Sequence, residues 1–163
     1  MINLKKSETQ SPDNNESYFS KTREQCQALL QMIHPAQPFY ENTESKIQGK
    51  MRNTVGAFLF YLPANKDLHF SEKISKKAKE LGQYVQEHET PRSVAAHEIF
   101  THNWGEEKNP VDTLVNLYTE KYAKYNYVTQ DENQKLRPFQ KLGVFKTPEI
   151  AYELAGIELE EFK

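Results

Sequence analysis

The sequence has little cysteine, little glycine and no excess of basic charge, and each shortage argues against a class of protein. Cys26 is the single cysteine, so an internal disulfide framework is excluded. The six glycines form neither a G-x-G-x-x-G pattern nor a P-loop, which argues against a standard nucleotide-using enzyme. The net charge of -2 provides no global basic field for nucleic acid. We therefore expect no cofactor, and nucleic acid is not the favoured partner.

Long apolar runs are also missing. The longest, VGAFLFYL at residues 55–62, has eight residues, too few to cross a bilayer. Residues 1–17 are polar and contain no apolar run that a secretory signal would need. The position of Cys26 on an apolar helical stripe indicates a buried thiol and fits a reducing compartment. We expect a cytoplasmic protein without a membrane partner.

Aromatic residues are the abundant component. Hydrophobic residues make up only 37% of the chain, but nine Phe, nine Tyr and one Trp are among them. The mean hydropathy is -0.84. Because each aromatic side chain buries a large area, we expect a small aromatic-rich core under a polar surface. We predict a disordered tail over residues 1–17 and a single globular domain over residues 18–163.

The spacing of apolar residues is mostly helical and predicts a mainly α fold, a single-domain bundle of about six helices. Capping residues and prolines set the expected ends. The predicted helices cover residues 21–34, ended by Pro35; about 44–62, with a buried strand as the alternative for its second half; 71–88, capped by Ser71; a fourth capped by Thr90; a fifth starting after Asn109; and a short one from Thr147 to Gly156.

A minor β element is the alternative for the region near residues 126–145. NYVT and QKLGVF have the composition of two short strands, and they are separated by DENQKLRPF. Pairing of these segments would form a small β-hairpin. The fold class would then be α+β.

The segment TPRSVAAHEIFTHNW, residues 90–104, concentrates the residues that could carry chemistry. His97 and His102 are five residues apart, about 140° around a helix, so they cannot bind one zinc ion as in H-E-x-x-H. The chain also contains no E-x-x-H. We therefore predict no metal site. A capped helix explains the segment, with Arg92, Glu98 and His102 on its solvent side and these residues on its buried side: Val94, Ala95, Ile99, Phe100 and Trp104.

Arg92 and His97 are separated by four residues near the start of this helix, giving R-x4-H. The spacing resembles the R-x4-6-H signature of HEPN-type ribonucleases. The resemblance implies that Arg92 stabilises charge on the scissile phosphate and that His97 acts as acid or base, usually across a dimer. It covers six residues. Ser93 departs from the amide-like or acidic residue usual after the arginine in that family.

Two further clusters have a structural and a binding interpretation. Lys73, Lys76, Lys77 and Lys79 are interspersed with Glu72 and Glu80, which is typical of a solvated helix face. The segment KYAKYNYV resembles the basic and aromatic mixture that stacks bases of single strands. The tyrosines at positions 118, 122 and 125 fit one helical ridge, so core packing is favoured, and Tyr127 is left over.

The favoured function is a non-enzymatic, intracellular protein-binding module of the inhibitor, immunity or assembly-subunit type. No catalytic residues are predicted in this interpretation. The HEPN-like alternative, RNA cleavage or RNA binding through Arg92 and His97, makes the chain an RNA-directed protein instead. The partner is another protein, and a homo-oligomer is the open alternative. Aromatic residues of predicted loops are the candidate binding surface. They are Phe39, Tyr40, Phe70, Tyr127 and Phe139.

Overall fold

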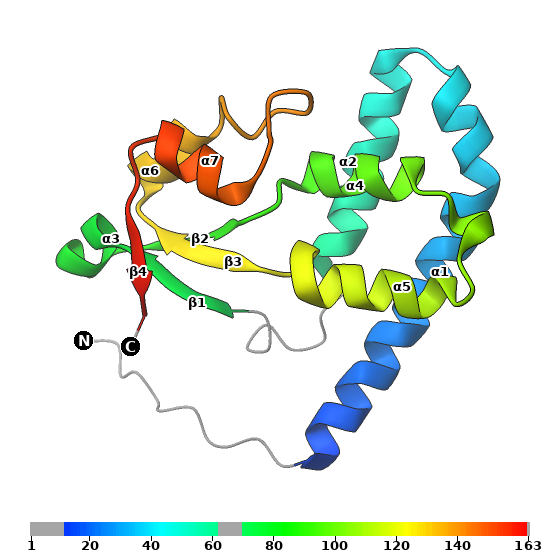
Figure 1. Ribbon diagram of the computed structural model, residues 1–163, viewed down its shortest axis with the longest axis horizontal. Coiled ribbons are helices and arrows are strands. Elements are labelled where there is room, and N and C mark those ends of the chain that lie inside the picture. The colour runs from blue at the N-terminus through cyan, green and yellow to red at the C-terminus, as the bar shows by residue number, and fades with distance from the viewer. Residues whose placement is uncertain (1–11, 62–69, 163) are drawn as a thin grey trace.

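The computed structural model describes residues 12–61 and 70–162, which form seven α-helices and one four-stranded sheet. The predicted fold class, mainly α with a minor β element, is confirmed. Figure 1 shows the helices α1, α2, α4 and α5 together on one side and the sheet with α3, α6 and α7 on the other. We call these the helical half and the sheet half. None of the described helices has the length and apolar composition that a bilayer-crossing segment needs.

The helical half packs four helices around one apolar core. Cys26, Ile33, Ile99 and Leu114 are at most 1% exposed in this core, so the predicted burial of the Cys26 thiol is confirmed. Burial raises the pKa of this thiol to about 12, which keeps it unreactive. The helices are α1 (Pro12–Asn42), α2 (Ser45–Tyr61), α4 (Arg92–Thr101) and α5 (Pro110–Leu117), with short helical turns at Trp104–Glu106 and Tyr118–Tyr122.

The sheet half has strand order β2-β3-β1-β4. β1 is parallel to β3 and antiparallel to β4, and β2 is antiparallel to β3. Helices α6 and α7 cover one face, where Val128 and Tyr152 belong to a second apolar cluster. The elements are β1 (Phe70–Ser75), α3 (Lys76–Leu81), β2 (Val85–His88), β3 (Tyr125–Val128), α6 (Gln130–Leu136), α7 (Pro148–Leu154) and β4 (Leu159–Glu161).

The first predicted helix is too short at both ends. α1 begins at Pro12, inside the predicted tail, of which residues 1–11 lie outside the described ranges. The predicted stop at Pro35 is wrong, because the helix continues through Pro35 and Pro38 to Asn42. Tertiary contacts hold this last part in place. Gln37 Nε2 donates to the Phe100 and His102 carbonyl oxygens, at 2.9 and 2.7 Å, and Tyr40 is buried.

The prediction of one helix over residues 71–88 is also wrong. The segment forms β1, the short helix α3 and β2. Ser75 rather than Ser71 caps α3, accepting a hydrogen bond from the Ala78 amide at 3.0 Å, and Gly82 ends it with φ of 63°. The lysines of α3 pair with carboxylates: Lys76 with Glu158, Lys77 with Asp131 and Lys79 with Glu160.

The hairpin predicted near residues 126–145 is half correct. NYVT lies in and directly after β3, but the neighbours of this strand are β1 and β2 rather than QKLGVF, which lies in turns. The reason is a capping box: Thr129 and Glu132 start α6 immediately after β3. The helix predicted from Thr147 to Gly156 is confirmed as α7. Its buried residues are Ala151 and Tyr152, whereas Ile150 and Leu154 are exposed.

The helix predicted over the 90–104 segment is confirmed as α4, but the predicted cap at Thr90 is wrong, because Pro91 is the N-cap residue and no side chain caps the helix. Its predicted buried side is also confirmed, and Trp104 lies in the turn that follows, 2% exposed. The indole Nε1 donates to the Ile99 carbonyl oxygen at 2.8 Å. The fifth predicted helix is α5 with its following turn, where Tyr118 and Tyr122 are buried. Tyr125, predicted on the same ridge, is instead the first residue of β3.

Gly56 sets the distance between α2 and the start of α4. A Cβ at this position would lie 3.1 Å from the Arg92 carbonyl oxygen and 3.2 Å from the Arg92 Cβ. We expect Gly56→Ala to lower the free energy of unfolding by about 1 kcal/mol, although alanine is the better helix former. Gly49 on the same helix is the control, because its added Cβ meets only the Arg52 side chain at 3.8 Å. Gly49→Ala should raise stability by about 1 kcal/mol, and equal stabilisation by both variants in urea denaturation would contradict this account.

Candidate functional site

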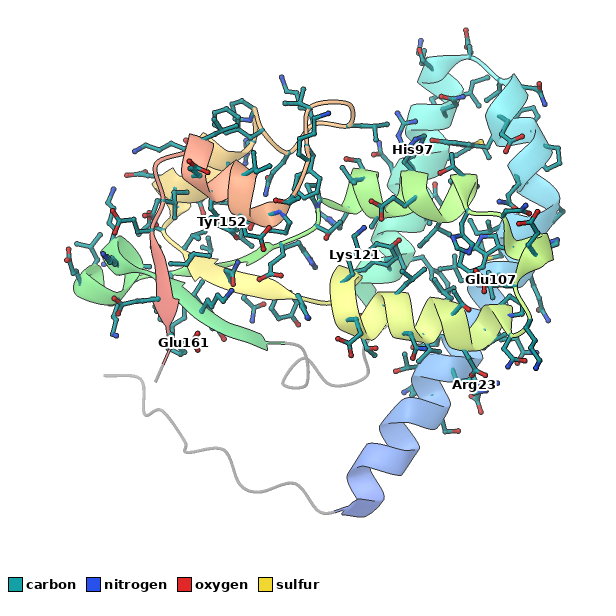
Figure 2. All side chains as sticks on the ribbon, in the orientation of Figure 1. Arg23, His97, Glu107, Lys121, Tyr152 and Glu161 are labelled. Carbon is teal, nitrogen blue, oxygen red and sulfur yellow. The ribbon has the colours of Figure 1, made fainter. Side chains whose placement is uncertain are left out.

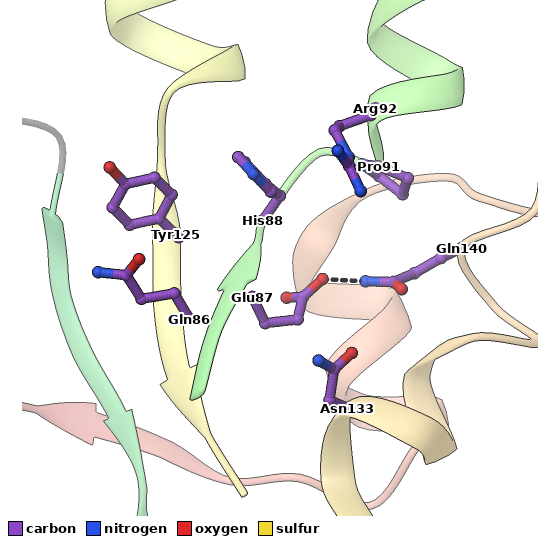
Figure 3. Close-up of a pocket in the computed structure, with 8 residues that line it drawn as sticks. All are labelled: Gln86, Glu87, His88, Pro91, Arg92, Tyr125, Asn133 and Gln140. Atoms are coloured by element: carbon purple, nitrogen blue, oxygen red, sulfur yellow. Dashed lines mark hydrogen bonds between the residues drawn. The ribbon is translucent and has the colours of Figure 1, made fainter. Parts of the chain in front are cut away.

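A cleft with two adjoining pockets lies between the helical half and the sheet half, where β2 ends and α4 begins. The first pocket, of about 480 Å³, is shown in Figure 3. The second has about 440 Å³ and extends toward α2. Pro91, Arg92 and Gln140 line both pockets and mark their junction. We call the first the amide pocket, after Gln86, Asn133 and Gln140, and the second the arginine pocket.

The arginine pocket is lined by three arginines from distant parts of the chain. Arg52 comes from α2, Arg92 from the first turn of α4 and Arg137 from the end of α6. Among the carboxylates in the described part of the chain, none forms an ion pair with Arg52 or Arg137. The positive end of the α4 dipole points to the same place. The pocket is therefore suited to an anion.

Glu87 forms the acidic wall of the amide pocket. This β2 residue is 6% exposed, and its carboxylate accepts a hydrogen bond from the Tyr152 hydroxyl. It accepts a second hydrogen bond from Gln140 Nε2 (Figure 3). Asn126 Nδ2 in turn donates to the Tyr152 hydroxyl at 3.0 Å. Burial raises the pKa of Glu87 to about 7, against the opposing effect of the two hydrogen bonds. Glu87 can therefore hold or release a proton near neutral pH.

His88 follows Glu87 directly, and its side chain lies on the opposite face of the strand. Its ring packs edge-to-face on Tyr125, with 5.4 Å between ring centroids. Burial and, to a lesser extent, the nearby Arg92 charge together lower the pKa of His88 to about 4, against a hydrogen bond with the Tyr122 backbone. The imidazole is therefore neutral at neutral pH and adds no charge to the cleft.

The two residues of the R-x4-H spacing occupy different environments. Arg92 lines the cleft, and its side chain extends from the start of α4 back toward β2 (Figure 3). His97 lies in the helical half (Figure 2), where its Nδ1 is 2.7 Å from the Tyr40 hydroxyl. The same hydroxyl accepts from Arg52 Nη1 at 3.0 Å. Burial and the Arg52 charge lower the pKa of His97. Tyr40 and Arg52 thus connect His97 to the arginine pocket.

The predicted surface aromatics are dispersed rather than gathered. Phe39 is 58% exposed on α1, whereas Tyr40 is 1% exposed and lies in the same helix rather than in a loop. Tyr127 is half-buried in β3, and Phe139 is half-buried against the core of the sheet half. Phe70 is the first residue of β1, and its side chain lies outside the described part of the structure. No single patch contains them all.

The polar residues of the 90–104 segment have ordinary partners. Glu98 accepts from Lys121 Nζ at 2.7 Å and from the Tyr122 hydroxyl at 2.9 Å. His102 Nε2 lies 2.7 Å from Glu107 Oε1, and Glu107 also accepts from the Thr113 hydroxyl. Over residues 12–61 and 70–162, no group of three or more His, Cys, Asp or Glu side chains could hold a metal ion.

No protein-family model, curated protein or solved structure matches this chain. The interpretation of the site therefore depends on its geometry. Sequence reasoning selected Arg92 but missed Arg52, Arg137, Glu87 and Gln140. The one local signal was the run of polar residues in VQEHETPRS, which leads directly into a helix start. The grouping of the arginines gave no signal, because they lie 40 and 45 positions apart in the sequence.

Proposed function

We propose that this protein binds a phosphate-bearing ligand in the cleft. The observation that supports the proposal best is the arrangement of Arg52, Arg92 and Arg137 around one pocket. Guanidinium groups match the oxygen geometry of phosphates and bind them through charge-assisted, often bidentate hydrogen bonds. This is a local basic site in a chain of net charge -2, so the binding does not need a global basic field.

The neighbouring groups support binding of an anion. Below neutral pH, protonated Glu87 adds no negative charge to the cleft, and no carboxylate in the described part of the chain forms an ion pair with Arg52 or Arg137. As the pH rises through about 7, Glu87 becomes negative and opposes an anionic ligand. The site thus combines three fixed positive charges with one proton that can be exchanged.

The test is isothermal titration of the full chain with pyrophosphate at pH 6. We expect Arg52→Gln, Arg92→Gln and Arg137→Gln each to weaken binding about tenfold or more, because each removes a hydrogen bond to a charged group. Lys46→Gln is the matched control, since Lys46 is an exposed cation of α2 outside both pockets, and it should change affinity less than twofold. Absence of pyrophosphate binding, or equal losses in the control, would refute the proposal.

A second proposed function is the favoured interpretation of the sequence, binding of another protein in the cytoplasm. The supporting observation is an aromatic cluster formed by Tyr84, Tyr127 and Phe162, whose ring centroids are 4.7 to 5.9 Å apart. Tyr84 is 41% exposed and Leu81 nearby in the sequence is 57% exposed. Exposed aromatic residues are typical interface anchors. Cross-linking in cell extract is carried out separately with the wild-type chain and with Tyr84→Ser. The comparison tests whether binding of one partner, or of a second copy, depends on this cluster.

A further inference from the structure

The amide pocket differs chemically from the arginine pocket beside it. Its walls carry three carboxamide side chains, Gln86, Asn133 and Gln140, and the rings of His88 and Tyr125. A pocket that only bound phosphate would have no need for these groups. Carboxamides present a donor and an acceptor in one plane, the arrangement that pairs with the edges of nucleobases.

We propose that the phosphate-bearing ligand is a nucleotide, with its phosphate in the arginine pocket and its base in the amide pocket. This inference rests on the proposed phosphate-binding function and names its ligand class. Arg92 and Gln140 line both pockets, so they lie at the junction where the sugar would pass. The volumes of about 480 and 440 Å³ lie in the range of small-molecule sites.

The hydrogen bonds already present define what the base must offer. Gln140 Nε2 uses one of its two N–H groups to donate to Glu87, so its carbonyl oxygen and its second N–H remain for a ligand (Figure 3). That oxygen accepts from an amino or ring N–H group of a base. Asn133, from the adjacent turn of α6, supplies a second amide on the same wall. Gln86, His88 and Tyr125 line the same pocket from the opposite face of β2 and β3.

Two sources contain this chemistry: a free mononucleotide and the terminal nucleotide of a nucleic-acid strand. Both present one base and one phosphate. They differ in the charge and length that continue beyond the cleft. Two sets of titrations distinguish the sources. The first uses the 5′-monophosphates of adenosine, guanosine, cytidine and uridine, and the second uses a short 5′-phosphorylated oligoribonucleotide.

The decisive comparison uses wild type and two variants of α6. We expect the best nucleoside monophosphate to bind at least tenfold more tightly than ribose 5-phosphate, in isothermal titration at pH 6. Asn133→Ala should weaken nucleotide binding about fivefold or more and leave pyrophosphate binding unchanged. Gln134→Ala is the matched control, since Gln134 is the next residue, is exposed and lies outside the pocket.

The outcomes separate this inference from the function on which it rests. If pyrophosphate and ribose 5-phosphate bind as tightly as every nucleotide, the phosphate function stands and the nucleotide inference is overturned. The same conclusion follows if Asn133→Ala weakens nucleotide and pyrophosphate equally. If neither pyrophosphate nor any nucleotide binds, the proposed function itself fails.

Discussion

Replacing Glu132 with alanine is expected to lower the free energy of unfolding by about 3 kcal/mol, because it leaves several buried donors without an acceptor. Glu132 is 6% exposed, and its Oε2 accepts from the Thr129 amide at 2.8 Å, the Thr129 hydroxyl at 3.0 Å and the Ser75 hydroxyl at 2.6 Å. Ser75 caps α3 and Thr129 caps α6. One carboxylate therefore joins the starts of two helices that are far apart in the sequence.

Two further variants separate this role from a general effect of lost charge. Glu132→Gln keeps an acceptor oxygen and the capping geometry, so its loss should be about 1 kcal/mol. Glu80→Ala removes an exposed carboxylate from α3 and should change stability by less than about 0.5 kcal/mol. Urea denaturation measures all three. A loss for Glu132→Ala no larger than that for Glu80→Ala would show that the buried network does not stabilise the fold.

The dependence of stability on pH is expected to change in opposite directions when Glu87 or His88 is replaced. Burial raises the pKa of Glu87 from 4.5 to about 7. Glu87 therefore contributes stability that is fully present below pH 4.5 and is lost as the pH rises through about 7. The contribution of His88 to stability depends on pH in the opposite direction, because its pKa falls from 6.5 to about 4. Its contribution is present above pH 6.5 and is lost as the pH falls through about 4.

Each of the two pKa changes corresponds to about 3.5 kcal/mol of unfolding free energy, at about 1.4 kcal/mol per pH unit. In the wild type the two effects offset each other between pH 4.5 and 6.5. Glu87→Gln should therefore gain stability relative to wild type as the pH rises from 4.5 to 7. His88→Gln should gain relative to wild type as the pH falls from 6.5 to 4. Denaturation curves at several pH values measure both differences, and parallel profiles for wild type and variants would contradict the assignment.

The sequence predicted those parts of the fold where local signals and burial agree. Val94, Ala95, Ile99 and Phe100 repeat at helical spacing, and all are buried in α4. Pro148 after Thr147 correctly indicated the start of α7. The prediction of one helix over residues 71–88 failed for a definite reason. The apolar spacing of this segment fits a helical stripe, yet Ile74 pairs in β1 and Val85 in β2, since pairing with β3 satisfies their backbone groups instead.

The candidate site was the part least accessible to sequence reasoning. The raised pKa of Glu87 results from burial, and the hydrogen bond that opposes the rise comes from Tyr152, which is 65 positions away in the sequence. The continuation of α1 through Pro35 and Pro38 likewise needs the contacts that Gln37 makes with the end of α4. Neither feature has a local signal. Each arises from contacts between distant segments.

By itself, the sequence determined that this chain forms a mainly helical fold with an aromatic core, a buried Cys26 and a helix that begins just after Pro91. Such features follow from the spacing of apolar residues and from capping within a few residues. Only the tertiary structure decided that Arg52, Arg92 and Arg137 line one pocket and that Glu87 faces the amides beside it. The physical reason is that charge convergence and desolvation depend on which segments pack together, and local spacing carries no information about that packing.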